Sequence, residues 1–368
     1  MVGHFEAAES KSRNATVLGG FIYEAHQRDT GFAETSLEAA IENPALARSL
    51  PYLQARIGID EAGIARLRRA IEKGALQSFD FMSIANGTVG DSPPEALALL
   101  LLDIADLPDG VEIALDILHM HFYRDREAGR QRNPTLIALG RNLLRRTDFS
   151  KKGTLRDYGL HTIIRVCCTG SDGEATARDV CANIRGAMEV CYLSRHDLSH
   201  VLKALFETHP AAGLDMFLLP EMTSRNHRLF DADFSFGTPV ENMDPAVLRQ
   251  WADQDAATRY TLLGRAISMF RRKVDDEEDN GISPLFLDML NYAPDKRAFL
   301  GDFWTRLHPR SWSGSLADIL ARRKAQVLTF RESPYADVRQ WVDAILPELD
   351  RRIDHERSRD REGEESFE

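Results

Sequence analysis

Asp255-Ala-Ala-Thr-Arg-Tyr260 recurs in altered form as Pro294-Asp-Lys-Arg-Ala-Phe299 and again as Pro334-Tyr-Ala-Asp-Val-Arg-Gln340. In each stretch a proline or an aspartate stands where a helix begins, and a basic and a hydrophobic residue follow within about one turn. The arginines at 259, 297 and 339 are 38 and 42 residues apart. A period in this range is typical of stacked helix pairs, so the sequence predicts an all-α protein.

Helical patterning extends outward from these stretches, and no run of alternating apolar and polar residues predicts a sheet. Three helix pairs are expected near the carboxyl terminus: 244–253 with 256–272, 284–292 with 295–307, and 315–328 with 334–346. Towards the amino terminus, helix openings are expected at Asp29, Asp60, Ser92-Pro93-Pro94, Asn133-Pro134, Asp172 and Pro210.

The carboxyl-terminal pairs resemble HEAT-type repeats, in which a proline or aspartate opens the second helix and a Val-Arg pair follows. Pro334, Asp337, Val338 and Arg339 carry this likeness. It covers residues 240–350 and extends, less regularly, over 15–220. The resemblance implies an α-solenoid of HEAT-like antiparallel helix pairs. It also implies that Arg339 bonds to an acid of a neighbouring repeat, with Asp318 and Asp343 as the candidates.

The expected organisation has four parts. Residues 1–222 form an irregular amino-terminal helical repeat region, and 223–243 form a loop or irregular connection with few helix formers. Residues 244–350 contain the HEAT-like repeats. Residues 351–368 are a charged tail, expected to be a frayed and solvated helix end.

The composition excludes several classes of function. A net charge of −11 disfavours broad binding to DNA or anionic membranes. The first residues do not predict a signal peptide, and the most apolar run, 96–102, is too short to span a bilayer. A cytoplasmic protein without a membrane partner is therefore expected. The four cysteines form no Cys-x-x-Cys pair and are expected to be buried, reduced thiols.

No phosphate-binding loop, dinucleotide fingerprint, nucleophile elbow or His-Glu-x-x-His motif is found. These absences disfavour the common NTPase, dinucleotide-binding and hydrolase functions, and no cofactor is predicted. His196 and His200 are four residues apart on one expected helix face, a spacing at which two imidazoles can ligate one zinc ion. Surface or interface histidines are the simpler interpretation of the pair.

A basic segment departs from the acidic character of the chain. Residues 124–157 contain ten Arg and Lys against four Asp and Glu, a local charge of +6. The segment is either a solvated face or a patch that binds phosphates or an acidic partner. The candidate binding residues within it are Arg132, Arg141, Arg145, Arg146, Lys151 and Lys152. Trp312, in an expected loop, is a further candidate, as an anchor for a partner.

The overall character of the sequence around Trp251, Trp312 and the charged end also resembles the carboxyl-terminal helical region of large bacterial multidomain proteins. Several of those proteins act in defence against phage. We therefore expect a non-catalytic interaction or scaffold module that binds a protein partner, in a bacterial defence or signalling setting. Nucleic-acid or nucleotide recognition through 124–157 is the first alternative. An enzyme with an unrecognised site is the second.

Overall fold

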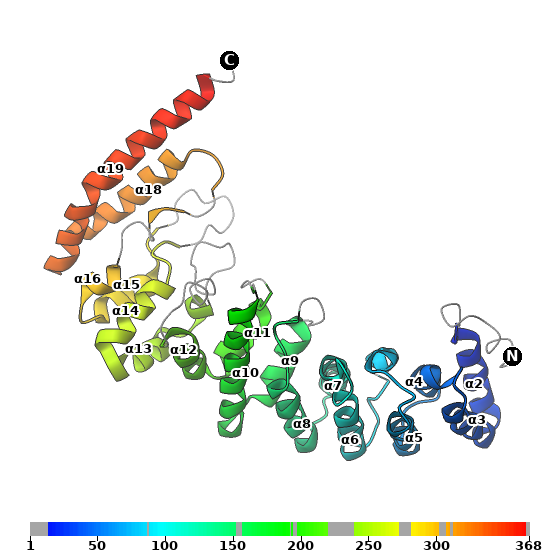
Figure 1. Ribbon diagram of the computed structural model, residues 1–368. Coiled ribbons are helices and arrows are strands. Elements are labelled where there is room, and N and C mark those ends of the chain that lie inside the picture. Colours follow the sequence, from blue (N-terminus) through cyan, green and yellow to red (C-terminus); the bar gives the residue numbers. More distant parts are fainter. Residues whose placement is uncertain are drawn as a thin grey trace. The chain divides into compact units, whose positions relative to one another are not determined.

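In a computed structural model, the described residues form two compact units, Met1–Ala212 and Gly213–Glu368 (Figure 1). The described ranges are 14–86, 88–151, 157–191, 193, 197–219, 239–271, 281–301, 307–309 and 312–365. The division between the units falls inside helix α12 (Pro210–Leu218), ahead of the connection expected at 223–243. Most of that connection lies outside the described residues.

The expectation of an all-α protein is confirmed for the described ranges. Their only β-type pairing is one antiparallel bridge between Phe270 and Ile282. The helical elements of the first unit, with α12 at its boundary, are α2 (Thr16–Arg28), α3 (Thr30–Glu42), η2 (Ala47–Ser49), α4 (Leu50–Ala55), α5 (Glu61–Glu72), η3 (Ser78–Ile84), α6 (Pro94–Ala105), α7 (Gly110–Glu127), α8 (Pro134–Arg145), α9 (Asp157–Cys167), α10 (Ser171–Val190) and α11 (Ser199–Thr208).

These helices pack in two layers, each in chain order. In one layer α2 contacts α4, η3 joins α4 to α7, α7 contacts α9, and α9 contacts α11. In the other layer each helix contacts the next one in the order α3, α5, α6, α8 and α10. Figure 1 shows α7, α9 and α11 side by side, with α6, α8 and α10 as the neighbouring row. Stacked helix pairs pack in this way, because each pair covers the apolar flank of the next. Their assignment to the HEAT type stays a prediction.

The second unit contains the three predicted pairs, in the predicted order. After η5 (Pro239–Asn242), they are α13 (Pro245–Ala252) with α14 (Ala256–Ala266), α15 (Pro284–Tyr292) with α16 (Lys296–Leu300), and α18 (Leu316–Leu328) with α19 (Ala336–Glu365). Short 3₁₀ turns, η6 (Asp253–Asp255) and η7 (Thr329–Glu332), precede α14 and α19. Helix α14 contacts α16, and α16 contacts α19, so the second helices form one row.

Side-chain caps begin many of these helices where the sequence predicts them. The Asp60 carboxylate accepts from the Gly63 amide at 2.8 Å, and Asp295 accepts from the Ala298 amide at the same distance. Asp255 accepts from the Thr258 amide at 3.4 Å. Each cap satisfies an amide that the first turn of a helix leaves unpaired, and this is why short polar residues predict the starts well.

Basic side chains of one helix pair bind acceptors about one period away in the sequence. Arg145 and Asp179 are 34 residues apart, and Arg146 and Asp106 are 40 apart. The same kind of contact links Arg68 to Asp103, Lys151 to Asp109 and Arg249 to Asp288. Because the two partners belong to neighbouring pairs, these contacts fix how one pair sits on the next.

Two details differ from the sequence-based expectation. Arg339 bonds to neither candidate acid: its guanidinium donates to the Ser333 carbonyl at 2.5 Å, while Asp343 pairs with Arg331 at 3.1 Å. The expected tail continues α19 to Glu365 and is not wholly solvated, because Ile353 and Glu356 are buried. Helix α18 packs along α19 and supplies an apolar contact that the charged sequence of the tail does not indicate.

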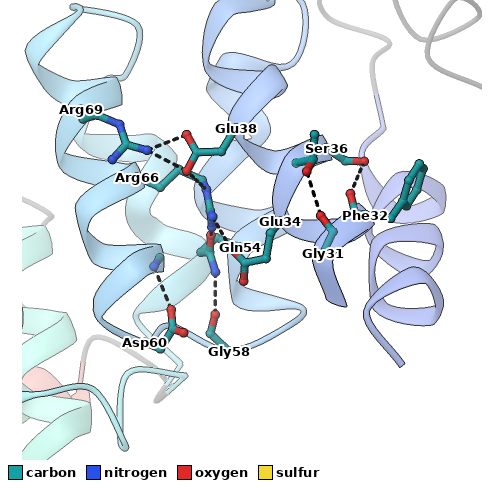
Figure 2. A network of polar contacts seen from close by, with 12 residues as sticks. Gly31, Phe32, Glu34, Ser36, Glu38, Gln54, Gly58, Asp60, Arg66 and Arg69 are labelled. Carbon is teal, nitrogen blue, oxygen red and sulfur yellow. Dashed lines mark hydrogen bonds and ion pairs between the residues drawn. The ribbon is translucent and has the colours of Figure 1, made fainter. Parts of the chain in front are cut away.

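A buried arginine joins the first helix pairs (Figure 2). Arg66 of α5 is 2% exposed and forms ion pairs with Glu34 and Glu38 of α3. It also donates to Gln54 of α4, whose amide in turn donates to the Gly58 carbonyl at 2.8 Å. The guanidinium therefore connects three helices, and a buried cation is tolerated only with partners of this kind.

Glu38 is shared between Arg66 and a second arginine, Arg69, on the solvent side (Figure 2). Burial raises the pKa of Glu38, but hydrogen bonds from both arginines and their charges outweigh burial. The net effect holds its pKa below the ordinary value of 4.5. A carboxylate with a depressed folded-state pKa stabilises the fold above its ordinary pKa, and this stabilisation is lost as the pH falls through the folded value.

We expect Arg66→Met to lower the free energy of unfolding by about 2–3 kcal/mol, below the full cost of breaking a buried pair because both glutamates retain access to water. Arg69→Met is the matched control: it removes a cation from the same glutamate, but Arg69 is 47% exposed, so a loss under about 1 kcal/mol is expected. Urea unfolding of the full chain measures both. Equal losses would contradict a special role for the buried arginine.

The pH dependence gives a second test of this network. Glu38→Gln should destabilise the protein at pH 7, because the glutamine cannot form the ion pairs. The difference from the unsubstituted protein should shrink as the pH falls below 4.5, the ordinary glutamate value, because Glu38 then takes up a proton itself. Urea unfolding between pH 7 and about pH 3 measures the difference. A difference that stays constant over this range would refute the depressed pKa.

Helix α8 approaches α9 closely at a glycine. A Cβ atom on Gly140 would lie 2.4 Å from the Cys167 sulfur and 3.3 Å from a Leu118 methyl. Gly140→Ala should therefore cost about 1–3 kcal/mol through overpacking. Gly186→Ala, where a Cβ atom meets nothing within 4 Å, should instead gain about 0.5–1 kcal/mol from helix propensity. Thermal unfolding of the two variants should show opposite shifts, and two shifts of the same sign would argue against this packing.

Candidate binding surface

Four of the six candidate binding residues in the basic segment bind acceptors within the chain. Arg141 donates to the Cys167 carbonyl at 2.7 Å, and Arg145 pairs with Asp179 at 2.8 Å. Arg146 pairs with Asp106 at 2.7 Å, and Lys151 pairs with Asp109 at 2.6 Å. Arg145, Arg146 and Lys151 join neighbouring helix pairs, and Arg141 joins the two helices of one pair. A phosphate would have to compete with these contacts.

Arg132 and Lys152 complete the predicted set. Lys152 lies outside the described residues. Arg132 lies in the loop before α8, in the wall of a cleft, where its Nε is buried without a hydrogen-bond partner. The five described cations of the set therefore do not form one open patch. Phosphate binding by the segment stays a prediction.

A group of aromatic rings crosses three consecutive helices of one layer. His119 comes from α7, Tyr158 and His161 from α9, and His200 from α11. Tyr158 meets His119 edge-on at 6.1 Å between ring centroids, and it stacks on His161 at 6.1 Å. His200 lies edge-on to Tyr158 at 6.1 Å and to His161 at 6.2 Å. We call these four residues the His–Tyr surface.

The His–Tyr surface faces solvent. Tyr158 is 57% exposed, His200 is exposed, and His119 and His161 are half-buried. The side chains belong to helices that contact one another directly, α7 with α9 and α9 with α11. The rings are therefore held by rigid elements, the arrangement that preorganises a binding surface.

Charged groups at the edge of this surface influence His161. Burial lowers the pKa of His161 from its ordinary value of 6.5, and the positive charge of nearby Arg165 lowers it further, while Glu207 opposes the shift. Arg165 and Lys203 both contact Glu207, at 3.7 and 3.9 Å. The His161 imidazole is therefore neutral at pH 7 and has both a donor and an acceptor nitrogen.

The predicted zinc pair is not tested, because His196 lies outside the described residues. His200 belongs to the His–Tyr surface. In the part of the chain that the structure describes, no group of three or more His, Cys, Asp or Glu is arranged to hold a metal ion.

Trp312 is 46% exposed, as an anchor for a partner would have to be. One edge contact is recorded for its ring, with His308 at 5.6 Å between centroids. The exposed fraction is compatible with the predicted binding role, which stays a prediction.

Three of the four thiols are buried, as expected, and are poor candidates for chemistry, whereas Cys191 is half-buried. Cys167, Cys168 and Cys181 are buried and form no disulfide. Burial raises the pKa of Cys168 and of Cys181 to about 12 and shifts that of Cys167 in the same direction. The thiolate, which is the nucleophile, is therefore scarce at neutral pH.

His121 forms a polar cluster in the wall of the cleft. Its Nδ1 lies 3.2 Å from the Val89 carbonyl, and its Nε2 lies 3.4 Å from the Asp125 carboxylate. Both ring nitrogens thus face acceptors of the chain itself. This arrangement fits a positioning role for the ring better than that of a general base, which needs a free nitrogen.

Three members of the His–Tyr surface were not predicted from the sequence: His119 as a partner of the others, Tyr158 and His161. A signal was present in the spacing. His119, His161 and His200 recur at intervals of 42 and 39 residues, which is the period of the helix pairs. Residues one period apart on the same helix of each pair lie beside one another on the surface of a stacked array. Searching for recurrent chemistry at the repeat spacing would have found them.

None of the described helices combines the length and the apolar character needed to cross a membrane. Comparisons with known proteins identify no relative: the chain matches no protein-family model, no curated protein and no solved structure.

Proposed function

We propose that this chain is a non-catalytic helical-repeat module that binds a protein partner through the His–Tyr surface. One observation carries the proposal: four aromatic rings from three adjacent helices form one solvent-facing group. Tyrosine is enriched among the residues that dominate binding energy, because it offers a large contact area with few rotatable bonds.

The chemistry of the His–Tyr surface indicates which chemical groups a protein partner would present to it. The rings present apolar faces, and the neutral His161 imidazole adds a donor and an acceptor. Arg165 and Lys203 at the edge are both close to Glu207, so one of their two positive charges is offset there. The surface fits a partner with an apolar anchor residue surrounded by hydrogen-bonding groups. The bacterial defence or signalling setting belongs to the same proposal. It rests only on the resemblance of the sequence to the helical region of large bacterial multidomain proteins.

Nucleic-acid recognition is the second candidate, and one observation favours it. Tyr158 directly follows the basic segment 124–157, and aromatic rings beside basic residues can stack on single-stranded bases. Against it, Arg141, Arg145, Arg146 and Lys151 donate to acceptors within the chain. Phosphate binding would have to displace these contacts, so we rank this candidate below protein binding.

The test compares two tyrosines of equal exposure. Tyr158 and Tyr292 are both 57% exposed, but Tyr292 belongs to α15 of the second unit. Partners retained by the full chain are identified by mass spectrometry, produced separately and titrated by calorimetry. Tyr158→Ala should weaken binding about 30-fold, the equivalent of about 2 kcal/mol. Tyr292→Ala should leave the affinity within about twofold.

Two outcomes would count against the proposal. Equal losses in both variants would place the partner elsewhere on the chain. An affinity for single-stranded RNA or DNA that falls steeply between about 50 and 200 mM salt, and that depends on Tyr158, would favour the second candidate.

A further inference from the structure

A cleft of about 480 Å³ lies within the first unit, apart from the residues of the His–Tyr surface. It is bordered by the segment before α6, by α7 and by the loop before α8. Its polar lining residues include Asp91, His121, Asp125, Arg130, Arg132 and Asn133. The volume is within the range of sites that hold small organic molecules, about 300–1,000 Å³.

Most of the polar groups in the cleft are engaged with one another. Arg130 donates to Asp125 at 2.9 Å, to Asp91 at 3.2 Å and to the Gly90 carbonyl at 3.1 Å. His121 faces both Asp125 and the Val89 carbonyl. These contacts tie the loop before α8 to the segment before α6, so the cleft has fixed walls.

Arg132 is the exception. Among the described residues it makes no hydrogen bond or ion pair, and its Nε is buried without an acceptor. A guanidinium stays charged at every physiological pH, and a buried donor without an acceptor is unfavourable. The cleft therefore contains a cation to which no carboxylate of the described residues is bonded.

We propose that this cleft binds a singly charged carboxylate, held by the guanidinium of Arg132. A planar carboxylate matches the planar fork of an arginine and can accept two parallel hydrogen bonds from it. The charges around Arg132 set an upper limit on the ligand charge. Asp91 and Asp125 line the same cleft, and their carboxylates would repel a doubly charged phosphate more strongly than a monoanion.

A carboxylate can come from a free organic acid or from the acidic side chain of a peptide, and both present the same group to Arg132. The proposal does not depend on the His–Tyr surface. Its test uses purified chain and defined probes, so that its failure leaves the proposed function untouched.

The probes are acetate, benzoate, inorganic phosphate and a short peptide with one glutamate and blocked ends, each titrated into the full chain labelled with ¹⁵N. The readout is the arginine Nε–H spectrum, in which the Arg132 signal is assigned by its loss in Arg132→Gln. We expect benzoate to shift the Arg132 signal in a saturable way. Phosphate should bind at least tenfold more weakly than benzoate. A tighter response to the peptide than to benzoate and acetate would assign the site to the acidic side chain of a peptide, and the reverse would assign it to a free acid.

Arg132→Gln should weaken benzoate binding at least tenfold, with binding by the variant followed through the backbone amides around residues 130–134. Because Arg132 bonds to nothing within the described chain, the variant should keep its melting temperature. Arg124→Gln is the matched control, since Arg124 is also an arginine of the basic segment, is exposed and does not line the cleft. Unchanged binding in Arg132→Gln, equal losses in both variants, or phosphate binding as tightly as benzoate would each overturn the proposal.

Discussion

A short helix pair cannot cover its own apolar faces, so each pair in this protein depends on the next one along the chain. Apolar burial drives the stacking, but burial alone does not fix the register of one pair on another. Cations that reach acceptors one period away do fix it. Arg146 spans from the end of α8 to Asp106 after α6, and Arg145 spans from α8 to Asp179 of α10. The guanidinium of Arg66 does the same for the first pairs, from the interior.

Because cations fix the register of neighbouring pairs, the basic segment 124–157 has a structural role in the fold. When only the sequence is considered, a cluster of ten cations in an acidic chain suggests an anion-binding patch. Once the pairs are stacked, Arg145, Arg146 and Lys151 face carboxylates of adjacent pairs, and Arg141 faces a carbonyl of the other helix of its own pair. Excess local charge thus reflects contacts between repeats, whose acidic partners lie some 30 to 40 residues away in the sequence. Local charge counts cannot detect such pairing, because they sum over neighbours in sequence and not in space.

Sequence reasoning predicted the starts of helices better than their ends or their partners. Starts depend on local chemistry, as at Asp60 and Asp295, where one carboxylate satisfies one amide three residues later. The end of α19 depends on tertiary packing: α18 lies along it, and the helix continues through Pro347 to Glu365. The partner of Arg339 could not be predicted either, because a backbone carbonyl carries no sequence signal.

The same distinction separates the residues available for binding from those that maintain the fold. Recurrence at the repeat period does not by itself indicate function, since Arg259 and Arg339 recur and yet donate to nearby carbonyls. The imidazoles of His119, His161 and His200 recur at the same period, but they meet one another and Tyr158 on a solvent-facing side. Arg132 lies among cations that pair within the chain, and it has no such pair among the residues that the structure describes. In a stacked array, recurrence at the repeat period is therefore weighed together with exposure, and the exposed Tyr158 ring at the centre of this group is the reason that a binding role is proposed for it.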